Sequence, residues 1–558
     1  MKFRLIILWA LLAFGLTGAA LAQDENTLPN GVAAGDVTQT TAVLWAHSTA
    51  AGTVKFEYTN EDGSATGAMA VEVTDPLLPV KVNLSDLLPA TVYTYTATDA
   101  AGTSASGTFR TPAAVGEKVG LRVGVSGDWR GELAPYPAIA NVAERDLDFF
   151  IEHGDTIYAD YPSPDVPLGQ ATTLEEYRRK HNEGYSVRNG LNTWAALRAS
   201  TAVLATIDDH EVTNDFAGGA APATDPRFAA SPAEFINDTE LYETGLQVFQ
   251  EYNPLRDEFY GDTGDARTTD ERKLYRYQTY GGDAAVFLLD ARSFRDAEIP
   301  NPEAFTSEAL TPFMAALFAP GRTMLGQAQF DDLKANLADA QEQGITWKFI
   351  IIPEPAQNMG PVSAGDRFEG YAAERAALMQ FIVDSSITNV VFITADIHGT
   401  LVNNLTYQIE PGGEQQLTDV FEISTGAVAF DAPFGPTIVA LAAGLDFITP
   451  QQRALYTNLP PLLQENFMKE LINGQIEPFG YDLIGLEGSS LDATLVTGGY
   501  LATSSYGWTE FDIDAETQQL RVITYGIPYY TQAQATDEPD KILALTPAVV
   551  SEFTVNPK

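Results

Sequence analysis

The chain has 558 residues, of which 45% are hydrophobic, a length and composition typical of a globular protein with more than one domain. Its formal net charge of −43 argues strongly against non-specific binding to nucleic acid and against an anionic membrane surface as the main partner. It contains no cysteine, which excludes disulfides, thiolate metal sites and a cysteine nucleophile.

The first 22 residues have the pattern of a signal peptide. Lys2 and Arg4 precede an apolar run, and Ala20-Leu21-Ala22 supplies a small-residue cleavage site. An uncleaved N-terminal anchor is the alternative. No later stretch reaches the ~18 consecutive apolar residues of a transmembrane helix. We therefore expect a bacterial protein that is secreted or periplasmic, monomeric and not stably inserted in a membrane.

Residues 23–112 are predicted to form an antiparallel β-sandwich. From Leu28 to about Pro112, hydrophobic and polar residues alternate in TAVLWAHS, TVKFEYT, TVYTYTATD and SGTFRTP, while NEDGS and DAAGTS mark turns. The stretch LPATVYTYTATDAAGTSASGTFRTP resembles the last strands of a fibronectin type III-like domain.

Residues 116–558 are predicted to form a layered α/β domain. The apolar strands LRVGVS, LDFFIEHG, AVLATIDD, AAVFLLD, WKFIIIPEP and NVVFITADIHG are interleaved with helical stretches at 303–318, 326–343 and 370–386. Such near-continuous apolar strands are typical of buried sheets covered by helices. Near the C-terminus, YGWTEFDIDAETQQLRVITYG predicts a hairpin with DAETQQ as its turn, so antiparallel strands should close the sheet.

Four of these strands end in acidic or imidazole side chains. They are Asp128 in SGDWRG, Asp155 in HGDTIYAD, Asp208 and Asp209 in TIDDHEVTND, and Asp396 with His398 in TADIHG. One Gly-Asp after a strand is more often a helix cap or a turn. Four on successive strands of one sheet, as we expect here, would meet where ligands of α/β sheets bind. Carboxylates ~4 Å apart repel by about 4 kcal/mol per pair at an effective dielectric of about 20, so metal ions are the simplest counter-charge.

Of the five histidines, His210 and His398 follow the aspartates of these motifs, whereas His153 precedes Asp155. His47 is expected to pack within the sandwich or lie on its surface. His153 is expected to be structural rather than a ligand, and His181, in RRKHNEGY, to face solvent.

Together the motifs resemble the dinuclear metallophosphoesterases. RVGVSGDWRG and HGDTIYAD are similar to the Gly-Asp-Trp and Gly-Asp-x-x-Tyr motifs of purple acid phosphatases. Over nearly all of the mature chain, the resemblance is to the alkaline phosphatase D family, through GVAAGDVTQTTAVLWAH, GDTIYAD, DDHEVTND, LLDARSFRD, TMLGQAQFDDL, RFEGYAAER and TADIHG. It implies a hydrolase of small phosphate mono- or diesters. The implied fold is an α/β metallophosphoesterase core, with β-sheets flanked by helices, behind a fibronectin type III-like β-sandwich.

Two positions depart from the family pattern. The first metal motif of the family commonly has a cysteine ligand in a Ser-Cys pair, whereas this chain has Ser126-Gly127-Asp128. Asp128 can replace that ligand, as in the purple acid phosphatase motif. Ile207 stands where a tryptophan is expected before Asp-Asp-His.

The resemblance implies two metal sites that share one carboxylate. Asp128, Asp155, Tyr158 and His398 would form the first, and a phenolate among these ligands favours Fe(III). Asp155 would bridge to a second ion held by Asp209, Asn214 and Asp396, where oxygen donors favour Ca²⁺. Mn²⁺ and Zn²⁺ are the alternatives. Asp208 and Glu354 stay open as ligands, and Glu354 could equally cap a loop.

Two further residues are candidates for catalysis. His210 would stabilise or protonate the leaving oxygen, with the orientation of a ligand as its alternative. Arg130 would clamp a phosphate oxygen or pair with a surface carboxylate. A preference for monoesters or for diesters, including phospholipase D-type hydrolysis, stays open. The alternative from another class is a non-catalytic, calcium-stabilised adhesion or binding protein, which would need neither Tyr158 nor His398.

Overall fold

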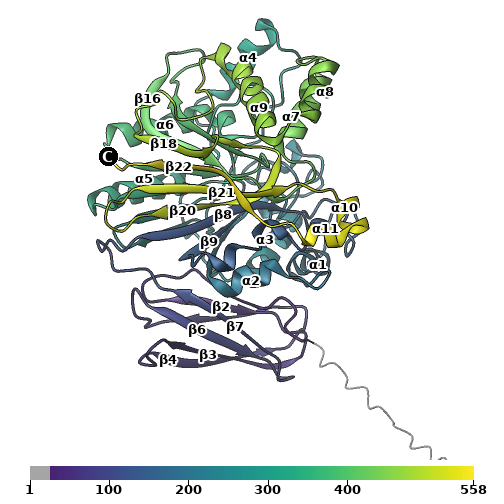
Figure 1. The fold of residues 1–558 in the computed structure, drawn as a ribbon, viewed down its shortest axis with the longest axis vertical. Helices are drawn as coiled ribbons and strands as arrows, with labels where there is room; N and C mark the ends of the chain where they lie inside the picture. Colours follow the sequence, from purple (N-terminus) through teal and green to yellow (C-terminus); the bar gives the residue numbers. More distant parts are fainter. Residues whose placement is uncertain (1–25) are drawn as a thin grey trace, which may run out of the picture.

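The computed structural model describes residues 26–558, and the predicted signal peptide lies outside the described residues. Within residues 26–558, none of the helices has the length and apolarity needed to cross a membrane. The N-terminal strands form one end of the molecule, and a group of helices forms the opposite end (Figure 1).

The N-terminal segment folds as two layers of strands around a shared core. One layer is an antiparallel sheet in the order β4 (Thr66–Val73), β3 (Gly52–Asn60), β6 (Val92–Thr98) and β7 (Ser104–Arg110). The other consists of β1 (Val32–Gly35), β2 (Ala42–Ala46) and β5 (Val80–Leu84). Phe56, Tyr93 and Phe109 of the first layer are buried in one cluster with Leu44 and Val82 of the second. The predicted β-sandwich is confirmed.

The second layer of this sandwich continues into the large sheet of the rest of the chain. β1 pairs in parallel with β10 (Ala202–Thr206), so that Ala34 lies opposite Ala202. The Trp45 indole donates a hydrogen bond to the carbonyl of Glu251 at 2.9 Å. The N-terminal layers are therefore attached to the remainder by sheet hydrogen bonds as well as by packing.

The large sheet combines parallel strands at its centre with antiparallel strands at both sides. Its order is β18 (Ala493–Gly498), β22 (Ala548–Val555), β21 (Leu520–Pro528), β20 (Ser505–Ile513), β8 (Leu121–Trp129), β9 (Phe149–His153), β10, β1, β2 and β5, with β17 (Ala427–Ala429) paired to β8 outside this order. β8, β9 and β10 are parallel. The hairpin predicted near the C-terminus is formed by β20 and β21.

A second sheet packs against the first. Its order is β11 (Arg276–Tyr280), β12 (Ala284–Leu288), β13 (Trp347–Ile351), β14 (Val390–Thr394), β16 (Gln416–Ser424), β15 (Thr400–Tyr407) and β19 (Leu501–Ala502). Val125 and Ile151 of the large sheet share a hydrophobic core with Ile351 and Ile393 of this one. The expectation that the four acidic strand ends lie on one sheet is wrong, because β14 belongs to the second sheet. Face-to-face packing brings its end to those of β8, β9 and β10.

Helices flank the two sheets, as predicted. They are α1 (Leu174–Tyr185), α2 (Thr193–Ser200), α3 (Glu240–Tyr252), α4 (Ser307–Leu317), α5 (Gln327–Glu342), α6 (Ala372–Asp384), α7 (Phe434–Gly444), α8 (Pro450–Asn458), α9 (Pro461–Ile476), α10 (Gln532–Asp537) and α11 (Pro539–Leu543). The stretches predicted as helical correspond to α4, α5 and α6. In Figure 1, α4, α7, α8 and α9 form the end of the molecule opposite the N-terminal sandwich.

The prediction that His181 faces solvent is wrong. Its side chain is fully buried in α1, and its ring stacks on Tyr252 with 5.1 Å between the ring centres. Its charged neighbours in RRKHNEGY do not keep it in solvent, because Arg178 pairs with Glu251 of α3 at 2.7 Å and Lys180 and Glu183 are themselves buried. Burial lowers the pKa of His181 to about 3, so the ring is neutral.

A buried ion pair ties the sheet to the helices that cover it. Glu152 of β9 accepts hydrogen bonds from Arg198 Nη2 at 2.7 Å and from the Trp194 indole at 2.6 Å. Arg198 Nη2 also donates to the Tyr185 hydroxyl and to Asn253 Oδ1. Both charged side chains are almost completely buried, so each depends on the other for compensation.

Arg198→Met should therefore destabilise the protein strongly, because it leaves the Glu152 carboxylate buried without a counter-charge. We expect the free energy of unfolding to fall by about 3–5 kcal/mol, measured by urea denaturation. Arg179→Met is the matched control, since Arg179 pairs with Glu175 on the exposed side of α1 and its loss should cost less than about 0.5 kcal/mol. Equal effects of the two substitutions would contradict the structural role of the buried pair.

Candidate metal centre

The glycine of each Gly-Asp motif is required by close packing between loops. A Cβ atom on Gly127 would lie 2.7 Å from the carbonyl oxygen of His153, and one on Gly154 would lie 2.8 Å from Cβ of Asp208. The backbone of the next loop is fixed in turn, because Trp129 N–H donates to the carbonyl of Asp155 at 2.8 Å. Only glycines let these strand ends approach closely enough for their carboxylates to converge.

Three of the four residues predicted for the first metal site, Asp128, Asp155 and His398, are brought together, and the fourth, Tyr158, packs on His210 with 4.2 Å between ring centres. Ligand atoms of Asp128, Asp155 and His398 lie within 4.8 Å of one another, and His398 Nε2 is 3.6 Å from Asp128 Oδ1. Both carboxylate oxygens of Asp128 and the hydroxyl of Tyr158 are buried without a hydrogen-bond partner in residues 26–558. Buried polar atoms normally have hydrogen-bond partners, so these three unpaired oxygen atoms are suited to bind a cation.

A second group of ligand atoms consists of Asp155, Asp209 and His210. Asp155 belongs to both groups, as a bridging carboxylate must. His210 Nε2 lies 4.0 Å from Asp155 Oδ2 and 4.0 Å from Asp209 Oδ1. An imidazole therefore stands beside the second site, where only oxygen donors were expected.

Asp396 lies in a third group, with Glu354 and Asp366 rather than with Asp209. Two buried arginines neutralise part of this group. Arg292 Nη1 and Arg295 Nη1 donate to Asp366 Oδ1 at 2.8 and 2.9 Å, and both guanidinium groups contact Glu354 Oε1. Glu354 thus pairs with arginines through one oxygen, while its other oxygen is buried and unpaired among the described residues.

Asp208, which stayed open as a ligand, is also held by an arginine. Arg292 Nε donates to Asp208 Oδ1 at 2.6 Å. Asp366, Arg292 and Arg295 were not singled out in the sequence analysis. The motifs LLDARSFRD and RFEGYAAER, to which the family resemblance pointed, contain or adjoin all three.

Asp160 is a further residue of the site that sequence reasoning missed. Its Oδ1 lies 2.6 Å from His210 Nδ1, and its Oδ2 accepts a hydrogen bond from the backbone N–H of Asn214 at 2.9 Å. It therefore orients the imidazole ring and the loop of the predicted ligand Asn214 together. The Asn214 side-chain amide donates to Asp215. The signal was present in the second aspartate of GDTIYAD.

Glu211 is buried and fixes two of the acidic loops. Its carboxylate accepts hydrogen bonds from the backbone N–H groups of Asp155, Thr156 and Asp208, at 3.2, 2.6 and 2.9 Å. This side chain acts from behind the metal groups and contributes none of their ligand atoms.

Arg130 lies beside the first group, among aromatic rings. Its guanidinium carbon is 4.6 Å from the ring centre of Tyr161 and 5.2 Å from that of Phe430. It also forms an ion pair with Glu132, which is buried rather than on the surface as the alternative supposed. Phe430 stacks on His398, with 3.5 Å between the ring centres, and so holds the arginine close to this ligand.

Burial and mutual repulsion disfavour the charged forms of the acidic groups. Burial raises the pKa of Asp128 and of Asp155 well above the usual range, and the charges of Asp208 and Asp209 raise both pKa values further. Burial also raises the pKa of Tyr158, with added effects from Asp155 and Asp128. Ionisation of all these groups at once therefore requires a cation between them.

The pKa values of the two histidines of the site are shifted in opposite directions. Burial lowers the pKa of His210, but the carboxylates of Asp209 and Asp160 outweigh it and raise the pKa to about 9. Burial, aided by the charge of His210, lowers the pKa of His398 to about 3. His398 is thus the neutral imidazole that a metal ligand must be.

His153 agrees with its expected structural role. Its Nε2 lies 3.0 Å from the carbonyl oxygen of Ile393, so the ring links β9 of the large sheet to β14 of the second sheet. His47 is buried in the sandwich, where its ring bonds to Asn30 and to the carbonyl of Pro76.

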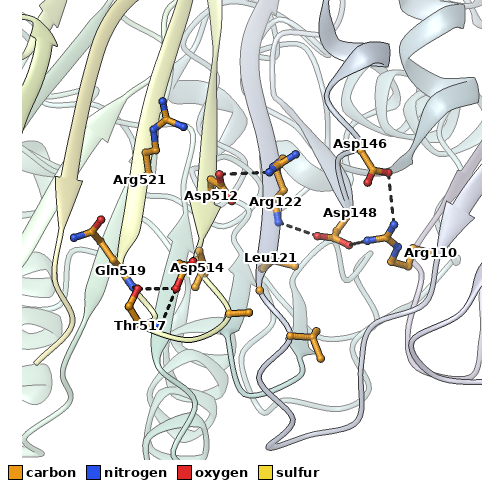
Figure 2. A pocket seen from close by; sticks show the side chains of 14 residues that line it. Arg110, Leu121, Arg122, Asp146, Asp148, Asp512, Asp514, Thr517, Gln519 and Arg521 are labelled. Atoms are coloured by element: carbon orange, nitrogen blue, oxygen red, sulfur yellow. Dashed lines mark hydrogen bonds and ion pairs between the residues drawn. The ribbon is translucent and has the colours of Figure 1, made fainter.

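A polar pocket of about 540 Å³ opens at the other end of β8 and does not belong to the metal centre (Figure 2). It lies at Leu121, about 26 Å along the strand from Trp129. Its three arginines are already paired: Arg110 with Asp148 at 3.0 Å, Arg122 with Asp512 at 3.5 Å and Arg521 with Glu552 at 2.8 Å. The pocket is therefore lined by a partly exposed ion-pair network.

Comparison with known proteins agrees with this geometry. The family model of the PhoD-like phosphatases matches residues 125–460, and that of their N-terminal domain matches residues 15–113. Alkaline phosphatase D of Bacillus subtilis (strain 168) is 27% identical over 439 residues, which span 72% of this chain and 71% of that protein.

The fold of the chain is shared by a solved structure of PhoD. A structure of PhoD is similar with a TM-score of 0.68 and 20% identity, over 95% of this chain and 91% of that one. The purple acid phosphatase PPD1 from yellow lupin (Lupinus luteus) seeds gives a TM-score of 0.47 and 12% identity, over 95% of this chain and 74% of that one.

The family model covers more than half of the chain, which therefore belongs to the PhoD-like phosphatase family. The predicted fold class and the resemblance to the alkaline phosphatase D family are confirmed. The protein is an enzyme that hydrolyses phosphoric esters, so the alternative of a non-catalytic adhesion protein is left without support.

Asp160→Ala should lower kcat without removing metal, because Asp160 positions His210 and lies outside the three groups of ligand atoms. We expect a fall of about 10- to 100-fold in the hydrolysis of p-nitrophenyl phosphate. Asp165→Ala, in the same loop but exposed, is the control and should retain wild-type kcat. A wild-type kcat in Asp160→Ala, or a loss of bound metal that accounts for the defect, would show that Asp160 does not act through His210.

Proposed function

We propose that this protein is a secreted or periplasmic phosphatase or phosphodiesterase with a dinuclear metal centre of the Fe(III)/Ca²⁺ type. The observation that carries the proposal is the shared carboxylate Asp155, which joins two groups of ligand atoms. Such a shared ligand is what places two cations side by side on one phosphate group.

The first proposed site consists of Asp128, Asp155, Tyr158 and His398, and its phenolate favours Fe(III) over softer or divalent ions. The second proposed site would hold Ca²⁺ through Asp155, Asp209 and Asn214, with Asp396 approaching from the neighbouring acidic group.

When bound, the metal pair would neutralise the charge on phosphate oxygens and make water a better nucleophile. The chain's own residues would do the rest. Arg130 would bind a phosphate oxygen through its Nε–H, which is unpaired among the described residues, while its Nη2 pairs with Glu132. Its aromatic neighbours would fix its position.

His210 would donate the proton at Nε2 to the leaving oxygen of the ester. Asp160 accepts the hydrogen bond at Nδ1 and so holds the ring with Nε2 turned towards Asp155 and Asp209. The raised pKa of His210 keeps that proton in place at neutral pH.

We further propose that the chain consists of three segments. Residues 1–22 would be a signal peptide, residues 23–112 a fibronectin type III-like domain and residues 116–558 the catalytic domain. The substrate would be a small phosphate mono- or diester, bound by a monomer.

Tyr158→Phe tests the iron assignment directly. A phenolate bound to Fe(III) gives a visible charge-transfer band, and the substitution should abolish this band in purified protein. Tyr161→Phe is the matched control, because Tyr161 packs against Tyr158 at 5.7 Å between ring centres yet lies outside the predicted ligand set. A colourless wild-type protein that contains zinc or manganese in place of iron would refute the assignment.

The calcium assignment predicts that hydrolysis is lost in a mild chelator such as EGTA and returns when Ca²⁺ is restored. Oxygen donors hold Ca²⁺ but bind Zn²⁺ poorly, so Zn²⁺ should restore little activity. Elemental analysis before and after chelation supplies the second measurement. Full recovery with Zn²⁺ would show that His210 serves as a ligand and that the second site does not select calcium.

A further inference from the structure

An apolar pocket of about 320 Å³ lies among α4, α7, α9 and the loops that follow β13 and β14. Its lining includes Leu310 of α4, Ile438 and Leu441 of α7, Ile472 of α9, and Met359 and Ile397 from the two loops. These helices belong to the end of the molecule opposite the N-terminal sandwich (Figure 1). The phosphate chemistry proposed above assigns no role to this pocket.

Two walls of the pocket are the same loops that carry groups of the metal centre. Ile397 stands between Asp396 and His398, and all three residues are partly exposed. Met359 lies in the loop that begins at Glu354 and leads to Asp366, the other two members of the third acidic group. The loops that follow β13 and β14 therefore contribute both to the pocket and to the metal centre.

A hydrogen bond attaches α7, which forms a third wall of the pocket, to the loop that carries His398. The backbone N–H of Phe434, the first residue of α7, donates to the carbonyl of His398 at 3.1 Å. The phenyl ring of Phe434 lies against Gly399, where an added Cβ atom would be 2.6 Å from Cβ of Phe434. α7 is thus held directly against the loop of the proposed iron ligand.

The pocket offers hydrocarbon surface and no free charge. Arg367 is the one charged residue among the described residues that line it. Its Nη2 is used by the carbonyls of Gly360 and Val362, at 2.9 Å each, and by Glu369. In a protein with a net charge of −43, a neutral hollow of this kind suits an uncharged, apolar group.

The rim of the pocket leaves apolar side chains in contact with water. Phe305, Leu441, Leu445 and Phe447 are 43%, 41%, 38% and 40% exposed. Contiguous exposed apolar residues of this kind mark a binding surface, because leaving them solvated forgoes about 25 cal/mol per Å².

We propose that this pocket binds the alkyl arm of a phosphodiester whose phosphate group lies at the metal centre. The proposal rests on the proposed function and adds the class of substrate. In the reaction, water adds to phosphorus and one P–O ester bond breaks. The leaving alcohol takes a proton, and a phosphate monoester that keeps the alkyl arm is released.

A pair of soluble substrates tests this assignment. In p-nitrophenyl methyl phosphate and p-nitrophenyl hexyl phosphate, the leaving group is the same and only the alkyl arm differs. We expect kcat/KM to be about tenfold higher or more for the hexyl ester, since each buried methylene contributes about 0.8 kcal/mol, or about a factor of four. Rates are measured well below the concentration at which the hexyl ester forms micelles.

Leu441→Gln should lower the hexyl-to-methyl ratio of kcat/KM by about threefold or more. Leu455→Gln is the matched control: Leu455 is 53% exposed on α8 of the same helical group, lies outside the pocket, and should leave the ratio unchanged. Both substitutions are at exposed positions, so folding should be retained.

The outcomes separate this inference from the proposed function. If neither ester is hydrolysed by metal-replete enzyme, the phosphodiesterase proposal fails and the substrate assignment fails with it. If both esters are hydrolysed with equal kcat/KM, only the assignment of the pocket is overturned. A rise in kcat/KM that appears only when the hexyl ester forms micelles would also overturn the assignment, because the patch would then bind an aggregate surface. A dimer in sedimentation analysis that Leu441→Gln dissociates would overturn it as well, because the patch would then bind a second copy of the chain.

Discussion

The structure depends on one electrostatic constraint: several carboxylates are buried around a single region where strand ends of two sheets meet. In a medium of low dielectric, like charges a few ångströms apart cannot all ionise unless cations lie among them. Burial, followed by repulsion from neighbouring carboxylates, raises the pKa values of Asp128 and Asp155. Much of the surrounding architecture holds these groups together against it, from the glycines at 127 and 154 to the carboxylate of Glu211, which fixes the loops from behind.

The protein meets this constraint in two different ways on the two sides of the cluster. Around Asp366 and Glu354, the counter-charge is internal, because the guanidinium groups of Arg292 and Arg295 contact these carboxylates directly. Around Asp128, no lysine or arginine of the described residues pairs with the carboxylate, and both of its oxygens are left without hydrogen-bond partners. An arginine is a permanent part of the fold, whereas an exchangeable cation can also contact substrate. The side of Asp128, where no arginine pairs with the carboxylate, is therefore the side on which the chemistry is proposed.

The sequence predicted the elements better than their assembly. Apolar runs that end in Gly-Asp identified β8 and β9, and the helical stretches at 303–318, 326–343 and 370–386 identified α4, α5 and α6, because these signals are local. The division into two sheets could not be predicted, since the pairing of β14 with β13 and β16 rather than with β10 depends on long-range packing. The burial of His181 was missed for the same reason. Asp160 was missed because its role arises only when the turn after β9 folds against His210.

The large negative charge of the protein does not prevent an anionic substrate from reaching such a centre. At physiological ionic strength, the field of surface carboxylates is screened over about 8 Å, so most of the −43 net charge is not felt inside the cluster. What a phosphate group meets there is the local balance of charges, in which Arg130, the imidazole of His210 and any bound cations are the positive members. The acidic surface instead favours the accumulation of divalent cations near the protein. In the proposed mechanism, the global charge would therefore favour the uptake of metal ions, whereas the local charge would govern the binding of a phosphate group.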